Sequence, residues 1–136
     1  MPRILAIDYG GKRTGIAVTD PDQLIATGLT TLPTQELIPF LLNYISTEPV
    51  EKIIIGMPVN WDGTDTHATP LVRKAIKQIR HRLPKIPLEP VDERFTSSLA
   101  KQAMLDMGMK KKDRRVKGNV DVIAAAILLQ EYLQER

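Results

Sequence analysis

The sequence predicts an α/β protein in which one five-stranded, mixed sheet has helices on both faces. Three observations support this fold class. Two apolar runs joined by a glycine-rich turn open the chain, helix and strand patterns alternate after them, and a long apolar helix closes it. The length of 136 residues fits one domain, so we expect residues 1–136 to form a single unit.

The first third of the chain predicts three consecutive strands. Residues 3–8 contain four apolar residues in a row and end at Asp8, as a buried strand with a polar end would. A Gly-Gly pair then marks a tight turn into a second strand over residues 14–19, which is close enough in sequence to pair antiparallel with the first. Residues 24–32, rich in threonine, are expected to form the third strand.

The middle of the chain alternates between helix and strand patterns. Apolar residues at helical spacing predict helices over residues 34–47 and 71–83, and Thr34 is expected to cap the first of them. Residues 50–57 lie between them and contain a short apolar run typical of a parallel strand. Residues 86–91 predict a fifth strand, and its two prolines favour a place at the sheet edge.

The last third predicts two helices separated by a basic loop. A short helix is expected over residues 96–107, followed by a loop of lysines and arginines over residues 110–118. Asn119 is a good N-cap for a final helix over residues 120–133. That helix is rich in alanine and apolar over a wide arc, so we expect it to pack closely on the sheet.

The composition is typical of a soluble, cytoplasmic protein. The chain has no cysteine, which excludes disulfides and thiolate metal sites and fits a reducing compartment. No apolar stretch approaches the roughly 20 residues that a membrane span needs, so no membrane partner is expected. The N-terminus leads directly into a strand without the pattern of a signal peptide.

Charge is distributed unevenly along the chain, although the formal net charge is only +3. Residues 1–66 contain 4 Lys or Arg against 8 Asp or Glu, whereas residues 67–136 contain 15 against 8. A basic half favours a polyanionic partner such as nucleic acid. A solvated basic surface explains the same composition equally well.

Carboxylates are predicted to meet at one edge of the sheet. The first strand ends at Asp8 and the fifth is followed by Asp92 and Glu93, and the carboxyl ends of parallel strands share an edge. Asp121, expected in the first turn of the last helix, joins them if that helix begins at the same edge. Clustered carboxylates repel one another, and in a chain without cysteine an oxygen-binding ion such as Mg²⁺ or Mn²⁺ relieves this repulsion.

Each carboxylate also has a purely structural explanation. Asp8 can form a turn at the strand end, and Asp121 is favoured near a helix N-terminus whatever the function. Asp92 or Glu93 can pair with Arg94. The convergence of these residues in a chain with a basic half, rather than any one of them, favours metal-assisted phosphodiester hydrolysis, in which two ions clamp the attacking and leaving oxygens.

Four segments carry a resemblance to a known family. They read AIDYGGKRTGIAVTD at residues 6–20, IIIGMPVNWDGTDT at 53–66, VDERFTS at 91–97 and KGNVDVIAAAILLQEYL at 117–133. In this order they resemble the motifs of the YqgF/RuvX family of ribonuclease H-like proteins, and together they extend over nearly the whole chain. Ser97 stands where a second threonine is common, which retains a hydroxyl group.

The resemblance implies a ribonuclease H-like fold, with the second strand antiparallel to the others, and a nuclease activity. Two activities are associated with the family. One is processing of the 5′ end of the 16S rRNA precursor in ribosome biogenesis, which acts on structured RNA. The other is Holliday junction resolution, which acts on branched DNA and needs two active sites in a symmetric dimer. The protein is therefore expected to be a monomer or a homodimer.

The resemblance also assigns roles to the carboxylates. It implies that Asp8, Glu93 and Asp121 are catalytic and hold Mg²⁺ or Mn²⁺. Asp92 is a further candidate metal ligand beside Glu93, and the sequence does not choose between these two neighbours.

Residues expected to contact the nucleic acid lie beside the carboxylates or in the basic loop. They are Lys12, Arg13, Asn60, Arg94, Thr96, Lys110, Lys111, Lys112, Arg114 and Arg115. The cationic face of the helix over residues 71–83 is expected to follow the phosphate backbone with them. The structural alternatives are that Lys12 and Arg13 only flank the turn, and that the basic loop is a solvated segment.

Two other classes of protein remain open from the sequence. Sugar and acetate kinases and actin-like ATPases also begin with an Asp-x-Gly hairpin that binds phosphate, but they hold nucleotide between two such domains and this chain has room for one. A non-catalytic RNA-binding assembly factor would keep the carboxylates without using them.

Overall fold

The computed structural model of the chain describes residues 2–58, 62–92 and 117–136. The helix expected over residues 96–107 and most of the expected basic loop lie outside these ranges. Within the described ranges, no helix combines the length and the hydrophobicity needed to cross a membrane.

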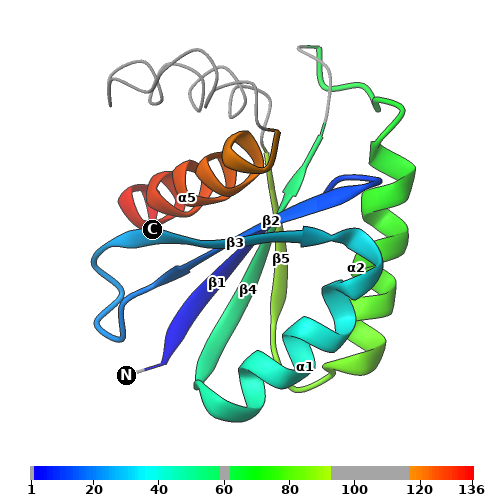
Figure 1. Cartoon of the computed structure of the whole chain (residues 1–136). Helices are drawn as coiled ribbons and strands as arrows, with labels where there is room; N and C mark the ends of the chain where they lie inside the picture. The colour runs from blue at the N-terminus through cyan, green and yellow to red at the C-terminus, as the bar shows by residue number, and fades with distance from the viewer. Residues whose placement is uncertain (1, 59–61, 93–116) are drawn as a thin grey trace.

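Five strands form one mixed sheet in the order β3-β2-β1-β4-β5 (Figure 1). The strands are β1 (Arg3–Asp8), β2 (Arg13–Thr19), β3 (Ala26–Pro33), β4 (Val50–Met57) and β5 (Leu88–Asp92). β2 pairs antiparallel with β1 and β3, whereas β4 pairs parallel with β1 and β5. This arrangement confirms the predicted mixed sheet, its antiparallel second strand and the edge position of the fifth strand.

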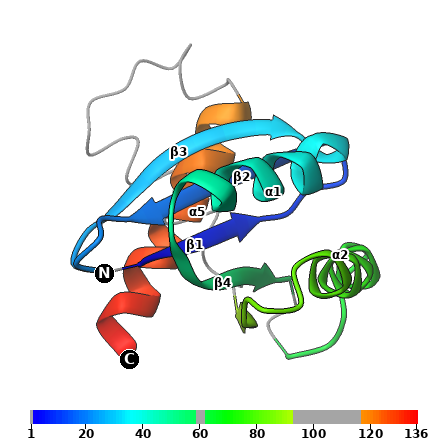
Figure 2. The same ribbon diagram turned by 90° about the horizontal axis from the view of Figure 1, so that it is seen from below.

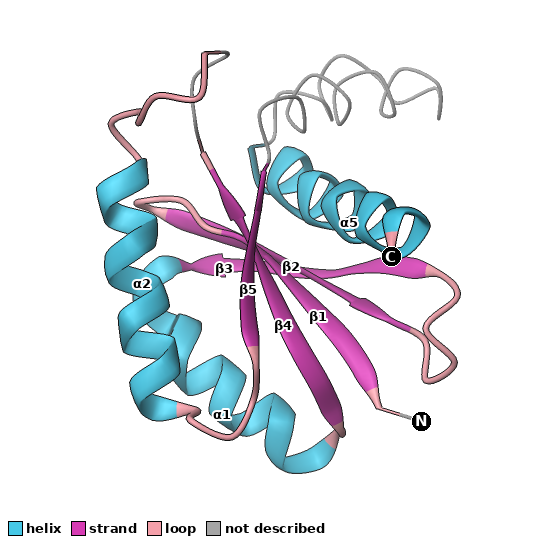
Figure 3. Ribbon diagram, turned by 180° about the vertical axis from the view of Figure 1, so that it is seen from behind, coloured by secondary structure: helices cyan, strands magenta, loops and turns pink. Residues whose placement is uncertain are grey.

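Helices cover both faces of the sheet, as the sequence predicts. The helices α1 (Leu37–Thr47) and α2 (Thr69–Arg82) lie on one face, and α5 (Lys117–Glu135) lies on the other (Figures 1 and 2). In the view from behind, α5 and α2 likewise lie on opposite sides of the sheet (Figure 3). Two hydrophobic cores result, one on each face of the sheet.

The alternation of side chains along β1 divides its residues between these two cores. Leu5 and Ile7 pack beneath α1 and α2, whereas Ile4 and Ala6 pack beneath α5. The side of α5 that faces the sheet is made of alanine and leucine: Ala124, Ala125, Leu128 and Leu129 are all buried. The small alanines near the start of α5 allow its backbone to approach the strands closely.

Thr34 does not cap a helix through its side chain, so that prediction is wrong. A 3-10 turn (Thr34–Glu36) precedes α1, and no side-chain cap is present at either element. The Thr34 hydroxyl instead donates to the carbonyl oxygen of Gly10 at 2.5 Å and shares a hydrogen bond of 2.8 Å with the hydroxyl of Thr14. The nearby β1–β2 turn offers Thr34 a carbonyl that needs a donor, and this long-range partner replaces the local cap.

The last helix begins earlier than predicted. α5 starts at Lys117, so Asn119 lies inside the helix rather than at its N-cap, and Asp121 lies beyond the first turn. The glycine and asparagine at 118–119 are weak helix formers, which favoured a later start from sequence alone. Such local preferences are small, and tertiary packing commonly overrides them.

Candidate active site

Asp8 lies at the carboxyl end of β1, on the face of the sheet that α5 covers. Side chains alternate along a strand, so Asp8 shares its face with Ile4 and Ala6, which pack beneath α5. Asp8 is directly paired with Gly15 across the β1–β2 ladder. Paired residues of antiparallel strands have their Cα atoms about 5 Å apart and point to the same face.

At Gly15 the backbone of α5 lies in direct contact with the sheet. A Cβ atom on Gly15 would overlap the carbonyl oxygen of Asp121 and would lie 2.9 Å from the backbone nitrogen of Val122. Only a residue without a side chain allows this contact. Asp8 and Asp121 therefore both lie next to Gly15 on the same face of the sheet, and the structure brings these two predicted catalytic residues together.

Arg13 forms an ion pair with Asp121 that the sequence does not predict. Arg13 Nε donates to Asp121 Oδ2 at 3.2 Å, and the two side chains are 39% and 23% exposed. A single hydrogen bond between partly exposed charges contributes about 1 kcal/mol or less to stability. Arg13, which is predicted to contact phosphate, is thus paired with Asp121, which is predicted to hold a metal ion. The two lie 108 positions apart in the chain, and no local pattern could have indicated the contact.

The turn between β1 and β2 is built by contacts within the protein. A Cβ atom on Gly10 would overlap the carbonyl oxygen of Arg13, so glycine is needed for the turn itself. The backbone nitrogen of Thr34, directly after β3, donates to the carbonyl oxygen of Lys12 at 3.0 Å and supports the turn. Gly11 and Lys12 are exposed, so this part of the turn is open to a ligand.

Asp92 lies on the opposite face of the sheet from Asp8. It is paired with Met57 across the parallel β4–β5 ladder, and Met57 packs against the core beneath α1 and α2. Its neighbour Val91 packs beneath α5, as alternation along β5 requires. Asp92 therefore sits at the correct edge of the sheet but on the face away from Asp121.

The remaining predicted site residues lie in segments outside the described ranges. Glu93 lies outside the described residues, as do the expected nucleic-acid contacts Asn60, Arg94, Thr96, Lys110, Lys111, Lys112, Arg114 and Arg115. No group of three or more potential metal ligands forms within residues 2–58, 62–92 and 117–136. Asp8 and Asp121 supply two oxygen-donating side chains of the kind that Mg²⁺ prefers, so the described part of the site fits a divalent ion with a third ligand to be added.

The loop after β4 is tied to the start of α2 by Thr69. The buried Thr69 hydroxyl accepts a hydrogen bond from the backbone nitrogen of Thr66 at 2.8 Å and donates to the carbonyl oxygen of Pro58 at 2.5 Å. Within the loop, Asp62 Oδ1 accepts from the backbone nitrogen and the hydroxyl of Thr64 at 3.0 and 2.7 Å. These contacts hold the ends of a segment that the sequence places near the site.

The outer face of α2 has cations but no acidic residue. They are Arg73, Lys74, Lys77, Arg80 and Arg82. Arg73 is held by Asp65 through two hydrogen bonds of 2.6 and 3.1 Å, and Arg80 donates to the carbonyl oxygen of Leu88 at 3.0 Å. Lys74 and Lys77 are exposed and form no ion pair with the described part of the chain.

The far end of α5 is held to the sheet by Tyr132. The ammonium of Lys52 donates to the Tyr132 hydroxyl at 2.7 Å, and that hydroxyl donates to Glu89 Oε2 at 3.0 Å. The hydrogen bond with Tyr132 is the main cause that raises the pKa of Lys52 above its usual value. With Gly15 at one end and Tyr132 at the other, α5 is fixed along its length, which sets the position of Asp121.

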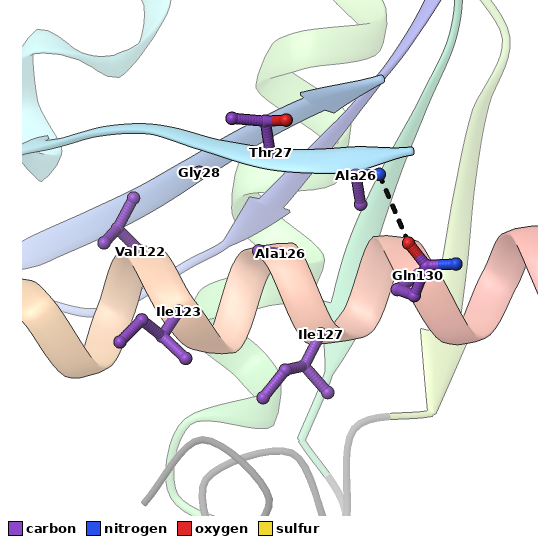
Figure 4. A pocket seen from close by; sticks show the side chains of 8 residues that line it. All are labelled: Ala26, Thr27, Gly28, Val122, Ile123, Ala126, Ile127 and Gln130. Carbon is purple, nitrogen blue, oxygen red and sulfur yellow. Dashed lines mark hydrogen bonds between the residues drawn. The ribbon is translucent and has the colours of Figure 1, made fainter. Parts of the chain in front are cut away.

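An apolar groove of about 430 Å³ lies between β3 and α5 (Figure 4). Its lining contains no charged side chain: Ala26, Thr27, Gly28, Val122, Ile123, Ala126, Ile127 and Gln130. Gln130 Oε1 accepts a hydrogen bond from the backbone nitrogen of Ala26 at 3.3 Å (Figure 4). Because this lining has no charged side chain that could hold a metal ion or act as an acid or base, the carboxylates next to Gly15 remain the candidate active site.

The strand order, the antiparallel second strand and α5 on its own face define the ribonuclease H-like class of folds. Two solved structures agree with this class. Thermus thermophilus RuvC in complex with a Holliday junction substrate superposes with a TM-score of 0.60 at 15% identity, covering 98% of this chain and 94% of that chain. A second Thermus thermophilus RuvC structure gives a TM-score of 0.53 at 15% identity, with coverages of 96% and 93%. At these identities the likeness concerns the fold.

The chain belongs to the RuvX family, whose profile, described as "Holliday junction resolvase", matches residues 2–135. A relative from Phocaeicola vulgatus is 54% identical over 136 residues, which are 100% of this chain and 98% of the relative. A relative from Bacteroides fragilis is 52% identical, with coverages of 100% and 99%. Both carry the name "Putative pre-16S rRNA nuclease". The family suggested by the four sequence motifs is thus confirmed.

Proposed function

We propose that this protein is a cytoplasmic, metal-dependent nuclease that processes the 5′ end of the 16S rRNA precursor. One observation supports the chemistry most directly: Asp8 and Asp121 both lie next to Gly15, on the same face of the sheet and at the carboxyl end of β1. Membership of the RuvX family supports a nuclease, and the names of relatives at about half identity support the precursor rRNA as substrate.

Asp8 and Asp121 are proposed ligands of Mg²⁺ or Mn²⁺, with Glu93 as the third. Glu93 is preferred to Asp92 because Asp92 lies on the opposite face of the sheet from Asp8. Bound divalent ions supply an activated water and stabilise charge on the leaving oxygen of a phosphodiester. The contribution of the chain is to hold its carboxylates rigidly, one on a central strand and one on a helix packed against that strand.

Cationic and polar side chains near the carboxylates, together with lysines of α2, are proposed to hold the nucleic acid. Lys12 is exposed on the β1–β2 turn, and Lys74 and Lys77 are exposed on α2 without ion pairs to the described residues. Arg13, Asn60, Arg94, Thr96 and the basic loop with Lys110, Lys111, Lys112, Arg114 and Arg115 extend the proposed contact. Cations of this kind bind the phosphate backbone, whereas A-form shape and 2′-hydroxyl groups distinguish RNA from DNA.

Resolution of Holliday junctions is the second candidate function. The description of the family profile favours it, because it names that activity. A resolvase must cut two strands of a branched DNA symmetrically, so it needs two copies of the site in one dimer. The same Asp8 and Asp121 carboxylates would act in either reaction, so the substrate and the oligomeric state separate the two candidates.

A cleavage assay with matched substrates tests the proposal. The purified full chain is incubated in Mg²⁺ with a 5′-extended fragment of the 16S rRNA precursor or with a four-way DNA junction. We expect discrete cleavage of the RNA, loss of cleavage in EDTA and no cleavage of the junction. Cleavage of the junction alone would establish the resolvase, and metal-independent binding of the RNA without any cleavage would establish an assembly factor.

A further inference from the structure

The ion pair between Arg13 and Asp121 places a cation where the proposed function requires a metal ion. Arg13 Nε occupies one carboxylate oxygen of Asp121, with an N–O distance of 3.2 Å. A divalent ion on Asp121 would place two positive charges next to the positively charged guanidinium of Arg13. Like charges repel more strongly as they approach, so this arrangement is unfavourable. Arg13 and a metal ion therefore compete for the same carboxylate.

The geometry of the pair allows Arg13 to leave. One hydrogen bond joins the two side chains, and the Arg13 side chain is 39% exposed, so water is available to both partners during an exchange. The pair between Arg73 and Asp65 differs, because two parallel hydrogen bonds of 2.6 and 3.1 Å hold its guanidinium in place. Of these two arginines, Arg13 is the one held by a single hydrogen bond, so it can release its carboxylate partner more easily.

We propose that Arg13 is an exchange residue that neutralises Asp121 in the metal-free protein and moves to a phosphate of the nucleic acid when a divalent ion binds. This inference rests on the proposed function, because it requires Asp121 to hold a metal ion. Arg13 begins β2 directly after the exposed Lys12, so a released guanidinium remains at the edge where substrate is expected. Arg13 is a positioning residue here, since it acts on the ion through Asp121.

The exchange couples the binding of metal to the binding of nucleic acid. A metal ion on Asp121 frees Arg13 for a phosphate, and a phosphate on Arg13 frees Asp121 for the metal ion. Each ligand therefore raises the affinity of the protein for the other, and the two effects are equal by thermodynamic linkage. The protein would bind its nucleic-acid substrate most tightly when the metal ion needed for cleavage is already bound.

Calorimetric titration with Mn²⁺ tests the first half of the exchange without any measurement of activity. The variants are Arg13→Gln, Lys12→Gln and Asp121→Asn. Lys12→Gln is the matched control, because it removes the same charge one residue away from a side chain without an ion pair in the described part of the chain. We expect Arg13→Gln to bind Mn²⁺ about two- to fivefold more tightly than Lys12→Gln, the range that a weak ion pair supports.

The second half is tested by the binding of a fluorescein-labelled RNA hairpin in EDTA and in Ca²⁺. The wild type and Lys12→Gln should gain affinity when Ca²⁺ is added, and Arg13→Gln should gain about two- to fivefold less than they do. Arg13→Lys, which keeps the charge, should lie between the wild type and Arg13→Gln. Circular dichroism confirms that each variant is folded.

The outcomes separate this inference from the proposed function. If Arg13→Gln matches Lys12→Gln in both titrations while Asp121→Asn loses Mn²⁺ binding, the exchange is overturned and the metal site stands. If Asp121→Asn binds Mn²⁺ as the wild type does, Asp121 is not a metal ligand, and the proposed exchange is contradicted as well.

Discussion

The backbone carbonyl of Asp121 occupies the space that a side chain on residue 15 would fill, so Gly15 and Asp121 are in direct contact between β2 and α5. Gly15 is also the ladder partner of Asp8. One glycine therefore sets the separation of two carboxylates that come from opposite ends of the chain. This relationship gives a structural reason for the glycine in the first sequence motif.

A methyl group at residue 15 is expected to displace α5. Gly15→Ala should lower the free energy of unfolding by about 1–3 kcal/mol, the usual cost of overpacking, because its nearest neighbours are backbone atoms that cannot turn away. Urea unfolding measures the change. Gly11→Ala is the control, since a Cβ atom there would meet nothing closer than Leu71 Cδ1 at 4.0 Å. Equal stability of the two variants would show that α5 is not held at Gly15.

The exposed lysines of α2 are expected to bind the nucleic-acid backbone. The double variant Lys74→Gln, Lys77→Gln should weaken RNA binding and reduce the slope of log affinity against log salt concentration by about 2, because each lysine neutralises one phosphate. Fluorescence anisotropy over a range of KCl concentrations measures the slope. Arg73→Gln should change it less, because Asp65 already holds Arg73. An unchanged slope in the double variant would remove α2 from the proposed interface.

The two neighbouring acids at the end of β5 are expected to differ in function. Asp92→Asn should retain cleavage within a few-fold of the wild type, because Asp92 shares its face of the sheet with Met57 and not with Asp8. Glu93→Gln should lose cleavage and weaken Mn²⁺ binding. Single-turnover cleavage and calorimetry on both variants decide the matter, and the reverse pattern would assign the metal ligand to Asp92.

Asp20 is expected to make the β2–β3 connection sensitive to acid. Its carboxylate accepts hydrogen bonds from the backbone nitrogens of Leu24 and Ile25, both at 2.8 Å. The bond from Ile25 is the main cause that lowers the pKa of Asp20 below its usual value of 3.8. A folded pKa below the unfolded one means that this stabilisation is present above the unfolded pKa and disappears as the pH falls through the folded pKa.

Asp20→Asn provides the comparison for that effect. The difference in free energy of unfolding between the wild type and Asp20→Asn should shrink as the pH falls from about 5 to about 2, since only the wild type has the ionised group to lose. Chemical denaturation at several pH values measures the difference. A difference that stays constant over this range would show that the carboxylate charge does not stabilise the turn.

Much of the fold follows from local patterns in the sequence. Periodicity located the five strands and the helices that the structure describes, and the short turn after Asp8 predicted the antiparallel hairpin that the structure contains. The end of the first strand placed Asp8 at the carboxyl edge of the sheet, whereas Asp121 was expected there only on the condition that the last helix begins at the same edge. Each of these features depends on properties that a segment shows by itself.

The parts that the sequence did not reveal depend on contacts between distant segments. Thr34 looked like a helix cap, but it hydrogen-bonds to the β1–β2 turn instead. Arg13 was expected to contact phosphate, and its ion pair with Asp121 was not predicted. In both cases the partner lies far away in the sequence, and only the packed structure brings the two groups within hydrogen-bonding distance.

Metal-dependent cleavage by variants of the two central carboxylates tests the proposed active site most directly. Asp8→Asn, Asp121→Asn and the control Asp22→Asn, an exposed acid in the β2–β3 connection, are compared on the precursor RNA at fixed Mg²⁺. We predict that Asp22→Asn cuts at the wild-type rate. The other two variants should fold but lose more than the roughly 10–100-fold that loss of an outer partner of a metal site costs. Wild-type cleavage by Asp8→Asn would contradict the assignment of Asp8 as a metal ligand.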